Sequence, residues 1–145
     1  MSAGGAYAGR RLLLVDDNEI NRELALGMLE VYGVEVDCAE NGLQALALLE
    51  RGAYDLVLMD CHMPELDGYG ATGEWRAREA RSGARRTPII ALTAAAMPGD
   101  REKCESAGMD DYVTKPFNRA MLDATLARWL PGGSAAQLIA RARGG

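Results

Sequence analysis

The stretch Arg11-Leu12-Leu13-Leu14-Val15-Asp16-Asp17-Asn18 decides the fold. Its first part is short and apolar without polar alternation, which is typical of a strand that is buried on both faces. Asp and Asn residues follow at once, and these residue types cap the first turn of a helix. We therefore expect a buried strand over residues 11–15 that leads through a polar turn into a helix.

The same unit of strand, turn and helix recurs along the rest of the chain. Ile20, Leu24, Met28 and Val31 repeat at helical spacing and predict a helix over residues 19–32. Further strands are predicted over residues 34–38, 54–59, 88–92 and 111–114, and further helices over residues 42–51, 68–82, 98–107 and 118–130. Strict alternation with apolar strands predicts a doubly wound α/β fold with a five-stranded parallel sheet.

Polar residues follow several of these strands at their carboxyl ends. In doubly wound sheets, ligands bind at this edge, where the strand order reverses. The residues at these positions are Asp16, Asp17, Asp60, Thr93 and Lys115. Neighbouring carboxylates cannot all ionise unless a cation screens them, and Mg²⁺ suits a few carboxylates with phosphate oxygens. An Asp carboxylate can also attack phosphorus, with a metal, a lysine and a hydroxyl around the phosphoryl oxygens.

Composition excludes several other classes of protein. The chain has 145 residues, 48% hydrophobic and 26% charged, as expected for one compact domain. Its 16 Lys and Arg against 21 Asp and Glu give a net charge of -5, which disfavours direct binding to nucleic acid. A run near the ~20 apolar residues of a membrane span is lacking, and residues 1–8 do not resemble a secretory signal. We expect a cytoplasmic domain without membrane contact.

Cysteine and histidine content argues against two further kinds of site. Cys38, Cys61 and Cys104 are odd in number and far apart, so we expect reduced thiols and neither a disulfide framework nor a zinc site. The single histidine, His62, is not accompanied by a G-x-S-x-G elbow, which disfavours hydrolase chemistry through a catalytic triad.

A group of arginines lies on and after the helix predicted over residues 68–82. Its members are Arg76, Arg78, Arg81, Arg85 and Arg86. Because Glu74 and Glu79 are nearby in the sequence, we expect a solvated basic face, with a docking site as the alternative.

Five motifs then occur in order at regular spacing. They are L-V-D-D-N at Leu14–Asn18, A-E-N-G-L-Q-A-L at Ala39–Leu46, L-V-L-M-D-C-H-M-P-E-L-D-G at Leu56–Gly68, P-I-I-A-L-T-A at Pro88–Ala94, and G-M-D-D-Y-V-T-K-P-F at Gly108–Phe117. Through them the chain, over about residues 10–130, resembles the CheY-like receiver domains of two-component response regulators. The sequences of these motifs are most similar to those in the receiver domains of hybrid histidine kinases. The resemblance implies a flavodoxin-like (βα)5 fold with strand order 2-1-3-4-5.

The resemblance also implies an acceptor and a metal site. Asp60 matches the phosphoacceptor of the family, and Asp16 and Asp17 match the acidic pair that holds Mg²⁺, with Mn²⁺ as an alternative cofactor. The backbone carbonyl of His62 matches the remaining protein ligand, and its side chain is expected in solvent.

The remaining matches concern catalysis and switching. Lys115 matches the lysine that binds the phosphoryl group, and its bond to Pro116 resembles the cis peptide of the family. Thr93 matches the switch hydroxyl, and Tyr112 matches the aromatic residue that turns inward towards it. Ala95 offers no polar group to orient water, so we expect slow to moderate autodephosphorylation.

The implied function is signalling by phosphoryl transfer. A histidine kinase or histidine phosphotransfer domain passes a phosphoryl group to Asp60, and the conformational change controls a partner or an attached domain. We expect residues 10–130 to form the receiver domain, residues 1–9 a flexible segment, and residues 131–145 a linker or tail.

Several alternatives remain open at this point. The domain is expected not to be an enzyme by itself, apart from accepting and losing its own phosphoryl group, and to come from a hybrid histidine kinase. A stand-alone response regulator is one alternative. A Mg²⁺-dependent phosphohydrolase is another, although that class needs a D-x-D motif on the first strand and here the acids are adjacent. A degenerate receiver with a constitutive binding surface is the third, and phosphorylation-dependent dimerisation is left open.

Overall fold

Strands and helices alternate along the part of the chain that the computed structural model describes, residues 7–93, 99–115 and 118–130. The strands are β1 (Arg11–Val15), β2 (Glu35–Ala39), β3 (Leu56–Asp60), β4 (Ile89–Thr93) and β5 (Asp111–Thr114). The helices are α1 (Glu19–Glu30), α2 (Gly42–Arg51), α3 (Gly68–Ser82), α4 (Asp100–Ala107) and α5 (Arg119–Trp129). The predicted strand and helix order is confirmed, with small shifts at the ends of elements.

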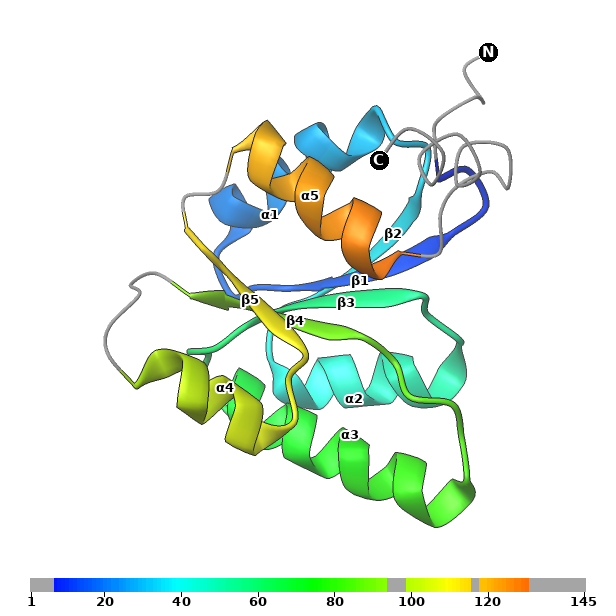
Figure 1. The fold of residues 1–145 in the computed structure, drawn as a ribbon, viewed down its shortest axis with the longest axis vertical. Helices are drawn as coiled ribbons and strands as arrows, with labels where there is room; N and C mark the ends of the chain where they lie inside the picture. The colour runs from blue at the N-terminus through cyan, green and yellow to red at the C-terminus, as the bar shows by residue number, and fades with distance from the viewer. Residues whose placement is uncertain (1–6, 94–98, 116–117, 131–145) are drawn as a thin grey trace.

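All five strands are parallel and lie in the order β2-β1-β3-β4-β5 (Figure 1). The chain passes from β1 outward to β2 and then returns to place β3 on the other side of β1. The strand order therefore reverses between β1 and β3, and their carboxyl ends meet at that point. This confirms the expected order 2-1-3-4-5.

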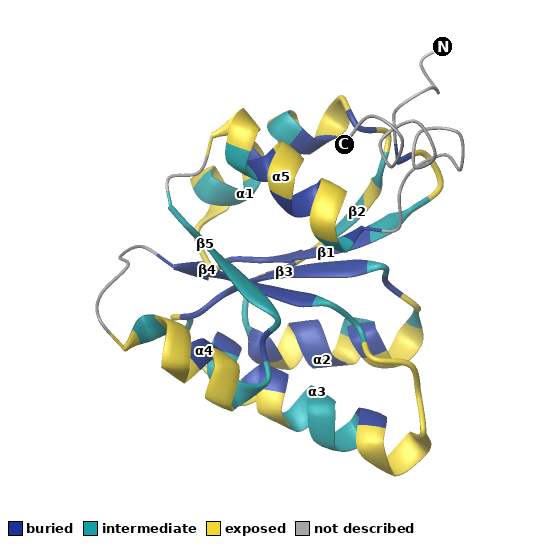
Figure 2. Cartoon of the chain, in the orientation of Figure 1, coloured by how far each residue is buried: buried dark blue, intermediate teal, exposed yellow. Residues whose placement is uncertain are grey.

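Helices cover both faces of the sheet. In Figure 1, α1 and α5 lie on one face, and α2, α3 and α4 lie on the other. Alternate residues of each inner strand enter opposite cores: Leu12 and Leu14 join one apolar cluster, whereas Leu13 and Val15 join the other. Burial on both faces, visible as dark strands in Figure 2, explains why the inner strands are continuous apolar runs.

Three of the four periodic residues predicted for the first helix do not face the core, and only Met28 packs against it. Ile20, Leu24 and Val31 are 67%, 62% and 59% exposed, whereas Ala25 and Leu29 are buried. The repeat correctly predicts a helix, but the buried face is offset from it by one residue, or about 100° around the helix. An apolar surface of α1 is thus left facing solvent.

The packed structure starts ahead of the expected domain boundary at residue 10. Tyr7 is 3% exposed, and its ring centroid lies 6.0 Å from that of Tyr32. The Tyr7 backbone N–H also donates to the Tyr32 carbonyl. Residues 1–6 and 131–145 lie outside the described part of the chain, so the division into segment, domain and tail stays a prediction. Among the helices that are described, none is long and apolar enough to cross a membrane.

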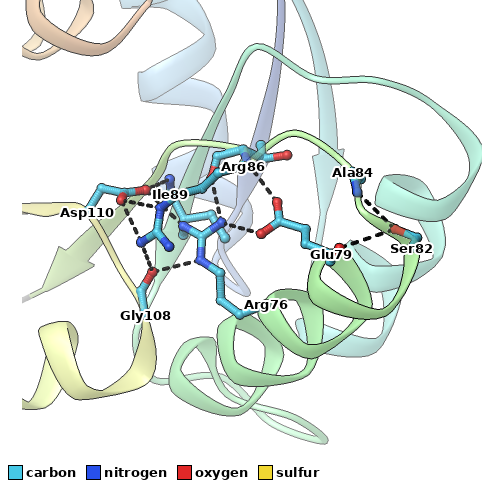
Figure 3. Close-up of polar contacts among 9 residues, drawn as sticks. Arg76, Glu79, Ser82, Ala84, Arg86, Ile89, Gly108 and Asp110 are labelled. Atoms are coloured by element: carbon cyan, nitrogen blue, oxygen red, sulfur yellow. Dashed lines mark hydrogen bonds and ion pairs between the residues drawn. The ribbon is translucent and has the colours of Figure 1, made fainter.

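Arg76 departs from the predicted solvated basic face. Its side chain is 13% exposed and pairs with Glu79 and Asp110 at 2.9 and 2.8 Å (Figure 3). Its Nε donates to the Gly108 carbonyl, and another guanidinium nitrogen donates to the Thr87 carbonyl. The prediction was wrong for this arginine because its partners come from α3, the start of β4 and the start of β5. The remaining members behave more nearly as expected: Arg81, Arg85 and Arg86 are exposed, and Arg78 is half-buried.

Candidate functional site

The carboxyl ends of β1 and β3 bring the predicted acids together. Asp16 follows the last residue of β1, and Asp60 is the last residue of β3. Because these strands are paired neighbours, carboxylate oxygens of Asp16, Asp17 and Asp60 all lie within 4.8 Å of one another. Asp16 and Asp60 are buried, at 2% and 5% exposure, whereas Asp17 is exposed. We call Asp16, Asp17, Asp60, Thr93 and Lys115 the carboxyl-edge site.

Lys115 reaches this group from the carboxyl end of β5, which lies beyond β4 in the sheet. Its ammonium nitrogen lies 3.2 Å from Asp16 Oδ2 and 3.4 Å from Asp60 Oδ2. Its backbone N–H donates to the Thr93 carbonyl at 2.7 Å, which extends the β4–β5 pairing past Thr114. One ammonium cannot balance three carboxylates, so the described group keeps a surplus of negative charge. Hard oxygen ligands with surplus negative charge fit a divalent cation such as Mg²⁺.

The pKa of Asp60 is raised above its ordinary value. Burial raises the pKa of Asp60 most, and the neighbouring Asp16 carboxylate raises it further. Lys115 and the His62 backbone N–H, which donates to Asp60 Oδ1 at 3.3 Å, act in the opposite direction and do not cancel the rise. Burial lowers the pKa of Lys115, but the attraction of Asp60 and Asp16 raises it overall. Ionised Asp60 is therefore costly until a cation neutralises it.

Local capping holds Asp16 in one orientation. The Asn18 backbone N–H donates to Asp16 Oδ1 at 2.9 Å, and the Asn18 side chain accepts from Asn21 N–H to cap α1. Arg22 donates to the Asp16 carbonyl at 2.7 Å. The Oδ1 atom is thus held by the backbone, and Oδ2 faces Lys115.

The loop after β3 folds back tightly over the strand end. Gly68 N–H donates to the Cys61 carbonyl, and a Cβ at Gly68 would lie 2.2 Å from the Asp60 carbonyl oxygen. Only glycine fits this close approach. The His62 side chain is exposed, as expected, and its ring centroid lies 5.9 Å from that of Tyr69.

The two predicted switch residues lie on neighbouring strands. Thr93 ends β4 and is 3% exposed, at the same edge as Asp60. Tyr112 is half-buried on β5, and the Arg101 guanidinium lies 5.3 Å from its ring centroid. Ala95 and Pro116 lie outside the described residues, so the slow autodephosphorylation and the cis peptide expected at these positions stay predictions.

Sequence reasoning missed two aromatic contacts near the site. The Lys103 ammonium on α4 lies 4.7 Å from the ring centroid of Tyr69 on α3. Arg101 covers Tyr112 in the same way. Each pair joins residues of different elements whose numbers differ by 34 and 11, so a local pattern does not predict the contact.

The cysteines are free thiols, as expected. Cys38 is exposed, and Cys61 and Cys104 are buried. Burial raises the pKa of Cys61 to about 12, and Tyr69 hydrogen-bonds with it. Such thiols pack as small apolar groups and are poor nucleophiles.

Comparison with known proteins identifies the family. Residues 12–127 match the response regulator receiver domain. The chain belongs to this family. It is a receiver domain of phosphorelay signalling, homologous to the receiver domains of hybrid histidine kinases. The fold and the strand order agree with that assignment.

Two curated relatives illustrate the homology. The sensor protein GacS of Pseudomonas syringae pv. syringae is 43% identical over 119 residues, and probable histidine kinase 4 of Oryza sativa subsp. japonica is 38% identical over 144 residues. The alignments cover 82% and 87% of this chain, but only 13% and 14% of those relatives. The receiver domain therefore corresponds to a small part of each relative.

Two solved structures are similar in fold and sequence. The receiver domain of the sensor histidine kinase PA1611 of Pseudomonas aeruginosa is 51% identical, with a TM-score of 0.75 over 84% of this chain and 98% of that one, and carries a magnesium ion in its active-site cleft. The receiver domain of Saccharomyces cerevisiae Ssk1, solved in complex with the histidine phosphotransfer protein Ypd1, is part of a structure that matches at 29% identity and a TM-score of 0.80, over 85% of this chain and 90% of that one.

Proposed function

We propose that this receiver domain accepts a phosphoryl group on Asp60 from a phosphohistidine of a partner. The observation that carries the proposal is the position of Lys115, whose ammonium lies 3.4 Å from Asp60 and 3.2 Å from Asp16. In the transfer, an Asp60 carboxylate oxygen forms a bond to phosphorus while the bond from phosphorus to the histidine nitrogen breaks. The imidazole leaves with the electron pair of that bond, and Lys115 neutralises the phosphoryl oxygens.

The acidic group is proposed to hold Mg²⁺. Asp16, Asp17 and Asp60 supply carboxylate oxygens, and the His62 backbone carbonyl is the fourth proposed protein ligand. When bound, the ion supplies positive charge to the phosphoryl oxygens. The magnesium ion in the similar PA1611 receiver supports this site, whereas Mn²⁺ stays an alternative without such support.

Thr93 and Tyr112 are proposed to report the phosphorylated state. Phosphorylation draws the Thr93 hydroxyl towards the phosphoryl oxygens and allows Tyr112 to turn inward, which reshapes the surface formed by α4, β5 and α5. Tyr112 must then leave its contact with Arg101. Hydrolysis of the aspartyl phosphate restores the first state, slowly to moderately because Ala95 does not orient water.

The phosphoryl donor is proposed to be a histidine kinase or a histidine phosphotransfer domain. The Ypd1 complex of the Ssk1 receiver supports a partner of this class, and the alignment to small parts of histidine kinases supports a hybrid kinase as the parent protein. A stand-alone regulator is the alternative. The cytoplasmic location, the tail at residues 131–145 and dimerisation on phosphorylation remain predictions.

The deciding experiment is phosphorylation of the purified chain with acetyl phosphate and Mg²⁺. Mass spectrometry is expected to show one added phosphoryl group in the parent chain, dependent on Mg²⁺, and none in Asp60→Asn. A Mg²⁺-dependent phosphohydrolase would instead release phosphate continuously from p-nitrophenyl phosphate. Modification that persists in Asp60→Asn, or that no donor produces, contradicts the proposal, and the second result favours a degenerate receiver.

A further inference from the structure

Few buried side chains hold helix α4 against the rest of the domain. All residues of α4 are described, and only Cys104 among them is buried, so the helix is largely exposed (Figure 2). Every other helix buries at least two residues. Gly99 precedes α4 and makes no side-chain hydrogen bond to its first turn. Burial and capping therefore fix α4 weakly, and the contacts of its exposed side chains contribute more to its position.

Two cations of α4 lie over aromatic rings of neighbouring elements. The Lys103 ammonium lies 4.7 Å from the ring centroid of Tyr69, in the first turn of α3. The Arg101 guanidinium lies 5.3 Å from the ring centroid of Tyr112 on β5. Both distances fall within the ~6 Å over which a cation is attracted to an aromatic face. The two contacts thus tie α4 to α3 and to β5.

These two contacts differ in whether the ring is proposed to move. Tyr69 packs against the apolar cluster beneath α2, α3 and α4, and the proposed switch does not include it. Tyr112 is proposed to turn inward when Asp60 is phosphorylated, and a ring that turns inward leaves the guanidinium of Arg101. The Arg101 contact therefore belongs to one of the two conformations, whereas the Lys103 contact belongs to both.

A hollow beside Tyr112 gives the ring room to move. It has a volume of about 210 Å³, and Arg101, Tyr112 and Arg128 are among its lining residues. Arg128 lies over the Trp129 ring, 5.5 Å from its centroid, and 3.8 Å from Asp111. It is thus engaged on α5 and at the start of β5. Because Tyr112 borders a hollow, packing alone does not fix its ring, and the contact with Arg101 adds a restraint.

We propose that Arg101 is a latch that holds Tyr112 outward, against α4, and so lowers the fraction of unphosphorylated molecules that have already switched. This inference rests on the proposed switching of Thr93 and Tyr112. A contact made in only one of two conformations changes the ratio of their populations by its own equilibrium constant. For a cation over an aromatic ring at a partly exposed site, that factor is about two to five. Arg101 acts through Tyr112 and is a positioning residue.

The test measures how tightly the chain binds beryllofluoride, a stable mimic of the phosphoryl group, in the presence of Mg²⁺. Occupation of Asp60 favours the switched conformation, so the apparent affinity rises when Tyr112 turns inward more easily. Calorimetry gives the dissociation constants of Arg101→Met, Lys103→Met and Arg128→Met. Each variant loses one positive charge and keeps a long side chain. Lys103 is the matched control, because it makes the same kind of contact from the same helix with a ring outside the proposed switch.

We expect Arg101→Met to bind beryllofluoride about two to five times more tightly than the parent chain. Loss of a positive charge by itself weakens the binding of an anion, so Lys103→Met and Arg128→Met should bind with equal or lower affinity than the parent. Arg101→Lys restores a cation and should return the affinity towards that of the parent. In a Tyr112→Leu background, Arg101→Met should no longer change the affinity, because the latch has lost its ring.

Other results overturn the inference. If Arg101→Met binds no more tightly than the parent, or if Lys103→Met or Arg128→Met gains as much, Arg101 is not a latch. A gain that persists in the Tyr112→Leu background shows that Arg101 does not act through Tyr112. If the parent binds beryllofluoride and Asp60→Asn does not, the acceptor site stands even where the latch fails. If the parent does not bind it, the proposed function fails and the latch fails with it.

Discussion

The two edges of the sheet hold buried charges in opposite ways. At the carboxyl edge, Asp16 and Asp60 share the ammonium of Lys115 and Asp17 adds a third carboxylate, and the pKa of Asp60 is raised by burial and by Asp16. At the amino edge, Arg76 and Arg86 meet Glu79 and Asp110, which we call the amino-edge cluster. Similar residue types thus form one group with surplus negative charge and one group in balance.

Hydrogen bonding separates the two groups further. Both oxygens of Asp110 are occupied, Oδ2 by Arg76 and the Ile89 N–H, and Oδ1 by Arg86. Glu79 accepts from Arg76 through one oxygen and from the Thr87 N–H through the other. A balanced and saturated group stabilises the positions of α3, β4 and β5, whereas an unbalanced group is available to bind a cation.

The largest expected effect tests the balance at the amino edge. Arg76→Met removes the cation shared by Glu79 and Asp110 and should lower the free energy of unfolding by ~3–5 kcal/mol, because two carboxylates lose their buried partner. Urea denaturation measures this loss. The control is Arg81→Met, whose side chain is 68% exposed; it should change stability by less than about 0.5 kcal/mol. A loss below about 1 kcal/mol in Arg76→Met would show that the cluster is not structural.

The next largest expected effect tests the surplus negative charge at the carboxyl edge. Mg²⁺ at 100 times its dissociation constant should raise the free energy of unfolding by about 2.7 kcal/mol, because it binds only the folded chain. Thermal unfolding with Mg²⁺, and with NaCl at equal ionic strength as the control, measures the gain. Asp17→Asn should weaken the response and Arg81→Met should not. An equal response in Asp17→Asn would contradict the proposed ligand set.

The third prediction is that replacing Asp by Asn changes the free energy of unfolding in opposite directions at the two edges. The pKa of Asp60 in the folded chain is raised above its ordinary value of 3.8, so ionisation of Asp60 costs stability once the pH rises past that value. Without metal, Asp60→Asn should therefore raise the free energy of unfolding at pH 7, and the gain should vanish at acidic pH. Asp110→Asn should lower stability by ~1 kcal/mol or more because it leaves donors unmatched. Urea titrations at several pH values compare the two, and equal signs would refute the comparison.

The smallest expected effect concerns Tyr54, which donates to Asp37 at 2.6 Å near the amino edge. Burial, and then the Asp37 hydrogen bond, raise the pKa of Tyr54 from 10.0 to about 12. The protonated phenol therefore stabilises the fold below pH 10, and this contribution is lost as the pH rises towards 12. Tyr54→Phe should lose ~1 kcal/mol at pH 7 and show a shallower decline above pH 10. If stability declines equally steeply above pH 10 in both proteins, groups other than Tyr54 cause the loss of stability at alkaline pH.

Much of the candidate site could be predicted from sequence because its members end strands. Asp16, Asp60, Thr93 and Lys115 each lie at or just past the carboxyl end of an apolar run. Parallel strands carry such residues to the same edge regardless of how many positions separate them. The contact of Arg101 with Tyr112 could not be predicted in this way, because it depends on how α4 lies against β5.

The sequence by itself determined the order of strands and helices and the edge at which the acids meet, since both follow from local periodicity and from the ends of apolar runs. Only the tertiary structure decided that Ala25 and Leu29, and not Ile20 and Leu24, face the core, because α1 carries apolar residues on two sides and the neighbouring elements select one. It also decided that Arg76 is buried, since an arginine becomes structural only where distant carboxylates and carbonyls converge on it.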